Sequence, residues 1–148
     1  MLIEFQQALA DLTASPRLCN EVAANPELLR GRYELTELEA RRLRVMVNSP
    51  GMTSNCVLYR ANRVAPLALN LPRLCRLLRA DLKDLLTEYW EQSPSTDVNF
   101  LVESARFCEF LQEKCRQGYE LSEEAKAAFD AEHLDLCLRL LASQTVLK

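Results

Sequence analysis

Arginine is the residue type whose number and spacing in this chain most clearly indicate chemistry. The stretch 40–80 contains eight arginines and no aspartate or glutamate, although the 148-residue chain has a formal net charge of −3. Guanidinium groups bind carboxylates and phosphates through paired hydrogen bonds. This distribution predicts a surface for an anionic partner, and an ordinary solvated helix face is the alternative for any single arginine. The eight residues are Arg41, Arg42, Arg44, Arg60, Arg63, Arg73, Arg76 and Arg79.

Four residues in the middle of this stretch, Tyr59, Arg60, Asn62 and Arg63, are the first candidates for binding a partner. On a helix, Tyr59, Asn62 and Arg63 share one face, and Arg60 lies about a hundred degrees away. Such a face, aromatic at one end and cationic at the other, fits a peptide backbone or a carboxylate-bearing loop. In the alternative interpretation, Tyr59 packs in the core and Asn62 caps a kink before Pro66.

Arg73 and Trp90 complete the predicted partner-binding residues. An interface needs buried apolar anchors in addition to polar contacts. Trp90 is the only tryptophan and follows Tyr89 at an expected helix end, so it is a candidate anchor. Burial of Trp90 in the protein core is the alternative.

Three motifs follow one another in the same region: YRANR at 59–63, LPRLCRLL at 71–78 and LLTEY at 85–89. Together they resemble the N-terminal helical domain of a bacterial family that was once labelled DNA-binding. The resemblance covers roughly 5–111. Better understood members resemble the small partner subunits of multinuclear iron oxygenases, which modify cysteines in ribosomally made peptides, as in methanobactin and thiaglutamate biosynthesis.

The resemblance implies a non-catalytic accessory subunit that binds a Cys-containing precursor peptide and forms a heterodimer with an iron-dependent oxygenase of barrel fold. Iron is then expected in the partner enzyme, and this chain is expected to hold no cofactor. Larger family members continue into a sheet that can hold a leader peptide by strand addition, and this chain is expected to end before it. We therefore expect a helical groove to capture the peptide. Pro66 also departs from the family pattern and is expected to kink or break its helix.

A nucleic-acid-binding transcription regulator is the alternative function. Against it, the net charge of −3 is unlike that of a typical basic DNA-binding domain, and no helix-turn-helix spacing can be placed. A stand-alone enzyme is a third possibility that lacks a catalytic constellation in the sequence.

No catalytic or metal-binding residues are predicted. The six cysteines show no CxxC spacing, and the single histidine, His133, has no partner histidine. The sequence also contains no glycine-rich phosphate loop and no HExxH motif. The thiols are expected to remain reduced in a cytoplasmic protein.

The composition predicts an all-α fold, a single compact multi-helix bundle over 1–148. Apolar residues make up 49% of the chain and only three glycines occur, so little sequence is suited to hairpins. Internal breaks are expected at 48–52 and 93–97, where proline combines with small polar residues. No apolar run is long enough to span a membrane, and the tail 145–148 is expected to fray.

Helix starts are predicted where a capping residue precedes an apolar pattern. The predicted starts are Ser15-Pro16, Asn25-Pro26, the capping box from Thr36 to Glu39, Thr53 or Ser54, and Ser122. Leu38, Leu43, Val45 and Val47 are expected to face inward, with Arg41, Arg42 and Arg44 on the opposite side.

Overall fold

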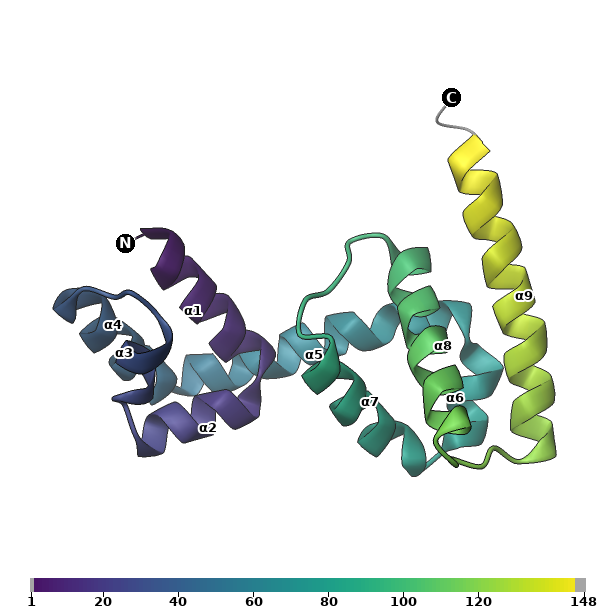
Figure 1. Ribbon diagram of the computed structural model, residues 1–148, viewed down its shortest axis with the longest axis horizontal. Helices are drawn as coiled ribbons and strands as arrows, with labels where there is room; N and C mark the ends of the chain where they lie inside the picture. The colour runs from purple at the N-terminus through teal and green to yellow at the C-terminus, as the bar shows by residue number, and fades with distance from the viewer. Residues whose placement is uncertain (1, 146–148) are drawn as a thin grey trace. The chain divides into compact units, whose positions relative to one another are not determined.

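The structure, a computed structural model, describes residues 2–145 (Figure 1). These residues form α-helices joined by short turns and loops, and no strand occurs among them, which confirms the all-α prediction. No helix in this part of the chain combines the length and apolar character needed to cross a membrane. The helices are α1 (Leu2–Ala14), α2 (Pro16–Ala24), α3 (Leu28–Arg32), α4 (Glu37–Val47), α5 (Pro50–Asn70), α6 (Pro72–Leu78), α7 (Asp81–Gln92), α8 (Phe100–Arg116) and α9 (Glu123–Thr145).

The chain divides into two compact units, 1–61 and 62–148, each with its own hydrophobic core. The boundary falls within α5, whose first part belongs to unit 1 and whose last part belongs to unit 2. Of the two expected breaks, 48–52 contains the short turn before α5, and 93–97 lies in the loop between α7 and α8. Residues 146–148, where fraying was expected, lie outside the described part of the chain.

Unit 1 is built from α1 to α4 and the start of α5. Ser15 caps α2 as predicted, because its side chain accepts a hydrogen bond from the Leu18 backbone N–H at 3.2 Å and Pro16 occupies the first turn. The capping box of Thr36 and Glu39 at the start of α4 is also present. Both starts could be predicted because the capping groups lie within three residues of one another.

The buried face of α4 differs from the predicted one. Leu43 and Val47 are buried as expected, but Leu38 and Val45 are 56% and 67% exposed. Their positions explain the difference, because Leu43 and Val47 are four residues apart and share a face, whereas Val45 lies two residues from each and points away. Leu38 and Val45 therefore lie on the exposed side, with the arginines of α4.

The start of α5 was predicted too late in the sequence. Instead of beginning at Thr53 or Ser54, the helix begins at Pro50. Proline fits the first helical position because its missing N–H has no intrahelical partner there. The hydroxyl of Ser49 lies 3.3 Å from the Met52 N–H and accepts a hydrogen bond from it, so Ser49 acts as the cap.

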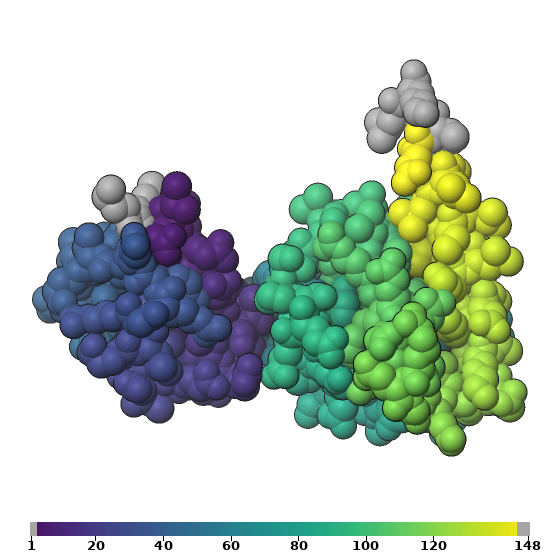
Figure 2. Space-filling model, viewed as in Figure 1, coloured from purple at the N-terminus to yellow at the C-terminus, as the bar shows by residue number. Residues whose placement is uncertain are grey.

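Unit 2 is built from the end of α5 and from α6 to α9. Its core includes Leu67, Leu74, Phe107, Leu111 and Leu136, all fully buried. The helix α9 packs against both α6 and α8. In Figure 2 the side chains of α8 and α9 lie next to one another on one face of unit 2.

A kink or a break was predicted at Pro66, and the structure excludes the break, because α5 continues through Pro66 to Asn70. The packing around Pro66 explains this result. Leu67 is fully buried, and the side-chain amide of Asn70 donates to the Phe100 carbonyl and to the Ser104 hydroxyl on α8. Tertiary contacts of this kind offset the local cost of a proline inside a helix, which is about 3 kcal/mol.

The connection from α8 to α9 has strong local signals. Gly118 follows α8 with φ of +104°, a conformation that favours glycine over residues with a Cβ. The hydroxyl of Ser122 then accepts a hydrogen bond from the Ala125 N–H at 3.1 Å and caps α9, as predicted. This connection places the end of α8 beside the start of α9.

Candidate functional site

Arg63 was predicted to bind a partner at the surface, and the structure corrects this prediction because the residue is inside unit 2. Its side chain is 1% exposed and pairs with Glu103, which is fully buried. The guanidinium donates through Nε and Nη2 to Glu103 Oε1, at 3.0 and 2.9 Å, and through Nη1 to the Ser93 carbonyl at 2.7 Å. All of this bonding is internal, so Arg63 supports the fold.

Trp90 is also buried, so the alternative interpretation of this residue fits the structure. Its ring contributes to the core of unit 2 and lies beneath the Arg63 guanidinium, 5.9 Å from centroid to Cζ. Tyr89 lies on the same guanidinium at 5.2 Å. Neither aromatic ring is available as an anchor for a partner.

The remaining predicted residues differ in exposure. Tyr59 and Arg60 are half-buried in unit 1, whereas Asn62 and Arg73 are exposed in unit 2. Of the predicted partner-binding residues in unit 2, only Arg73 lies among further exposed arginines.

Those arginines lie on α6 and at its C-terminal end, and they line a cavity of about 520 Å³. Arg73, Arg76 and Arg79 are exposed and line it, together with Glu124 of α9. Three guanidinium groups and one carboxylate give the lining a formal charge of +2. Within residues 2–145 none of the three arginines is in an ion pair, so they are available to a carboxylate or phosphate from outside. We call this feature the arginine cavity.

A carboxylate of α9 fixes the position of α6. Both oxygens of Glu132 accept hydrogen bonds from the start of α6, from the Arg73 N–H at 2.8 Å and from the Leu74 N–H at 3.0 Å. The residue before this helix, Leu71, provides no side-chain cap. Glu132 therefore replaces a local cap and holds the arginines of α6 beside α9.

Arg79 ends α6 in an unusual backbone conformation. Its φ of +49° makes it the only residue other than glycine with positive φ in the described chain. Side chains with a Cβ rarely adopt this region, and strained residues often lie at functional sites.

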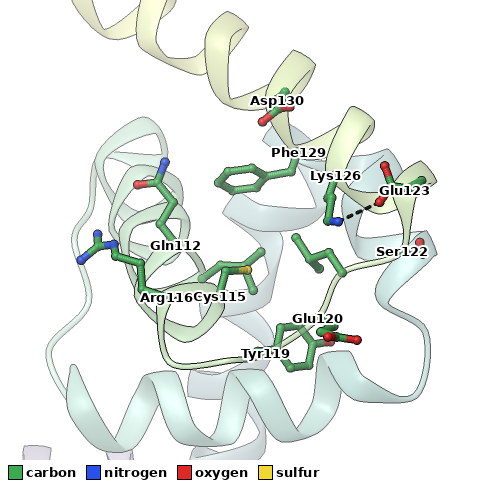
Figure 3. Close-up of a pocket in the computed structure, with 12 residues that line it drawn as sticks. Gln112, Cys115, Arg116, Tyr119, Glu120, Ser122, Glu123, Lys126, Phe129 and Asp130 are labelled. Carbon is green, nitrogen blue, oxygen red and sulfur yellow. Dashed lines mark hydrogen bonds and ion pairs between the residues drawn. The ribbon is translucent and has the colours of Figure 1, made fainter.

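A second hollow of unit 2 lies between the end of α8 and the start of α9 (Figure 3). Its volume is about 1010 Å³, in the range of small-molecule and peptide sites. Figure 3 shows Cys115 and Phe129 facing the hollow from the two helices. Leu111, Leu121 and Phe129 are buried and give it an apolar floor. We call it the apolar pocket.

The rim of the apolar pocket is charged. Lys126 pairs with Glu123 at 2.7 Å, and the exposed Glu120 and Asp130 add two further carboxylates. Inside the pocket, burial raises the pKa of the Cys115 thiol above its ordinary value, so at neutral pH this cysteine is a weak nucleophile. The pocket therefore combines an apolar floor with a charged rim.

The cysteines are spread over both units, and all six are free thiols. Cys19 and Cys56 lie in the core of unit 1, and burial raises the pKa of each. Among residues 2–145 no group of three or more His, Cys, Asp or Glu side chains is arranged to hold a metal ion.

Sequence reasoning missed Glu103 and the apolar pocket. A signal for Glu103 was present, because it lies four residues before Phe107 on the apolar face of α8, where an acid requires a buried partner. The pocket had no comparable signal, since its walls come from two helices and a loop. Compared with protein-family models, curated proteins and solved structures, the chain matches none of them.

Proposed function

We propose that this chain is a non-catalytic binding subunit that holds an acidic segment of a ribosomally made precursor peptide and docks on an iron-dependent oxygenase that modifies a cysteine of that peptide. Iron belongs to the partner enzyme in this proposal. The motifs at 59–63 and 71–78 support the biological setting through the family resemblance. The arginine cavity supports the mode of binding, and it is the single observation on which that mode depends.

The charge of the arginine cavity favours an anionic ligand. Three exposed guanidinium groups within eight residues of one another repel each other when no anion lies between them. A peptide with carboxylates relieves this repulsion and is attracted during its approach. The apolar Leu77 and Ala127 in the same lining offer contacts to the peptide chain between its charges.

In this proposal the partner oxygenase carries out the chemistry, and this chain only binds the peptide. A subunit that only holds the peptide needs selectivity and an exposed surface, and the chemistry is carried out by the partner's metal centre. Two of the three exposed arginines of α4 in unit 1, Arg41 and Arg42, give the partner enzyme a second cationic surface to contact.

Calorimetric titration with a synthetic decapeptide that contains four glutamates tests the binding mode. We expect the double variant Arg73→Gln/Arg76→Gln to bind this peptide about five- to a hundredfold more weakly, since each of the two lost contacts has a free energy of about 0.5–1.5 kcal/mol. The matched control is Arg41→Gln/Arg42→Gln, which removes the same charge from unit 1. Equal weakening by both pairs would show that net charge, and not the cavity, determines binding.

Two further experiments test the rest of the proposal. Random duplex DNA is titrated against the same variants, and tight binding of DNA in place of the peptide would favour the transcription regulator. Affinity-tagged chain is also purified from its source cells, and the captured partner is identified by mass spectrometry and assayed for iron. A partner without iron would contradict the oxygenase setting while leaving the peptide-binding result intact.

A further inference from the structure

We infer that the apolar pocket and the arginine cavity bind one and the same peptide, which carries an acidic residue and, three or four positions away, an apolar residue next to a lysine or arginine. This inference rests on the proposed peptide-binding function. It adds the pattern of side chains that the bound segment must have.

The floor of the apolar pocket accounts for the apolar residue of this pattern. Leu111 is fully buried, Leu121 and Phe129 are 9% and 8% exposed, and all three side chains line the hollow. An apolar side chain placed on this floor would be removed from water on several sides. The volume of about 1010 Å³ accommodates an aromatic or long aliphatic side chain together with neighbouring peptide atoms.

The rim accounts for the neighbouring basic residue. Both cations of the pocket already have partners, because Lys126 pairs with Glu123 and Arg116 pairs with Glu113. In the described part of the chain the exposed carboxylates of Glu120 and Asp130 are in no ion pair. The uncompensated charge at this rim is therefore negative, which favours a lysine or arginine of the ligand.

The first turns of α9 form a ridge between the two hollows. Glu124 and Ala127 line the arginine cavity, whereas Lys126 and Asp130 line the apolar pocket. At a hundred degrees per residue these two pairs face directions about a third of a turn apart. A helix with its side chains is about 10–12 Å across, and an extended peptide advances about 3.3 Å per residue, so three or four residues span the ridge.

The combination of sites favours a peptide over a small molecule. A small hydrophobic amine could occupy the apolar pocket, but it is too short to reach the guanidinium groups across the ridge formed by α9 as well. A peptide can present acidic, apolar and basic side chains in order along one chain. Joining the two contacts in one ligand also raises the effective concentration of the second contact once the first has formed.

The test uses the full chain and four synthetic decapeptides, with binding measured by calorimetry. The parent peptide has two aspartates, then phenylalanine and lysine three and four positions later, with glycine and serine elsewhere. Each of the other three peptides carries one change: serine replaces the phenylalanine, glutamate replaces the lysine, or serines replace both aspartates. We expect about tenfold weaker binding when phenylalanine is lost and about two- to fivefold weaker binding when lysine is replaced.

A charge exchange on the protein makes the test specific to the rim. In the variant Glu120→Lys/Asp130→Lys, whose two sites are exposed, we expect the peptide with glutamate in place of lysine to bind better than the parent. Thermal unfolding checks that the variant remains folded. An unchanged preference for lysine in the folded variant overturns the inference.

Alkylation of Cys115 reports directly on occupancy of the pocket. This thiol lines the pocket and is half-buried, and the half-buried Cys75 and Cys137 lie outside the lining and serve as internal controls. We expect the parent peptide to slow iodoacetamide labelling of Cys115 alone, measured by mass spectrometry. Equal protection by phenethylamine at the same concentration would show a small amine site and overturn the inference.

The outcomes separate this inference from the proposed function. If only the aspartates of the peptide matter, the acidic peptide function stands and the bipartite pattern is wrong. If the phenylalanine and lysine matter but the aspartates do not, the arginine cavity is not a peptide site and both proposals fail as stated. Loss of binding on each of the three changes, together with protection of Cys115, supports the full pattern.

Discussion

Arg63 and Glu103 form a buried ion pair that joins α5 to α8 within unit 2, with Nη2 and Oε1 2.9 Å apart. The two partners also hold the loop between α7 and α8. Arg63 donates to the Ser93 carbonyl at 2.7 Å, and Glu103 Oε2 accepts from the Asp97 N–H at 3.0 Å. The pair is therefore a connector of three segments, and its loss affects the whole of unit 2.

Replacing Arg63 by Ala should strongly destabilise the protein. Glu103 would be left as an unpaired charge in the core, for which the expected cost is about 3–5 kcal/mol of unfolding free energy. Urea unfolding followed by circular dichroism measures it. The control is Arg73→Ala on the surface, which should change stability by about 0.5 kcal/mol or less. If both variants unfolded at the same urea concentration, Arg63 would not have the structural role assigned to it.

Alanine substitutions on α4 should distinguish its two faces. Leu43→Ala removes a fully buried side chain and should cost about 2–5 kcal/mol. Leu38→Ala, at a residue 56% exposed, should change stability by about 0.5 kcal/mol or less. Thermal melts of the two variants provide the comparison, and a larger loss for Leu38 would restore the inward orientation predicted from sequence.

Replacing Glu132 by Ala should weaken peptide binding without altering any arginine. The start of α6 would lose the carboxylate that accepts its Arg73 and Leu74 N–H groups, at an expected cost of about 1–3 kcal/mol in stability. The arginine cavity would then be held less firmly, and the decapeptide with four glutamates should bind more weakly. Asp135→Asn, also on α9 and exposed, is the matched control, and it should preserve both stability and binding.

Alkaline pH should destabilise unit 2 through its buried thiols. Burial raises the pKa of Cys108 from 9.0 to about 12, because its thiolate would lie in the core. The folded state thus binds this proton more tightly than the unfolded chain. The resulting stability is complete below pH 9.0 and is lost as pH rises toward about 12.

Urea midpoints at about pH 7, 9 and 10.5 test this dependence. The midpoint should fall over the alkaline part of the range, and the fall should be smaller in Cys108→Ala, which lacks the titrating thiol. Tyr89, whose pKa is raised to about 12 by burial, should account for part of the remaining slope. An equal slope in Cys108→Ala and the parent would exclude Cys108 as a contributor.

The helix starts at Ser15 and Thr36 could be predicted from sequence because the groups that form each cap lie a few residues apart. The uninterrupted course of α5 through Pro66 could not, because it depends on α8, more than thirty residues away. The same reason applies to Arg63, whose partner Glu103 is forty residues away. Local chemistry specifies where α2 and α4 begin, whereas the start of α6 and the burial of Arg63 depend on residues far along the chain.

Of the two candidate sites, one was partly predictable from the sequence and the other was not. Arg73 could be predicted as an exposed cation from the acid-free stretch, and the structure adds Arg76 and Arg79 at the same cavity. The charge of a stretch can be counted without the fold, but which of its arginines are exposed cannot, since Arg63 in the same stretch is buried. The apolar pocket depends on how α8 and α9 pack, which the sequence pattern alone does not specify.

Arg79 places folding and recognition in conflict at a single position. With φ of +49°, its backbone would be relaxed by glycine, which should add about 1 kcal/mol to the stability of the protein. The same exchange would remove one of three cations from the arginine cavity. A sequence-design method that scores the folded state alone would therefore choose glycine here and weaken the binding surface. Stabilising substitutions in this protein should therefore be made at other positions, and Arg79 should be kept.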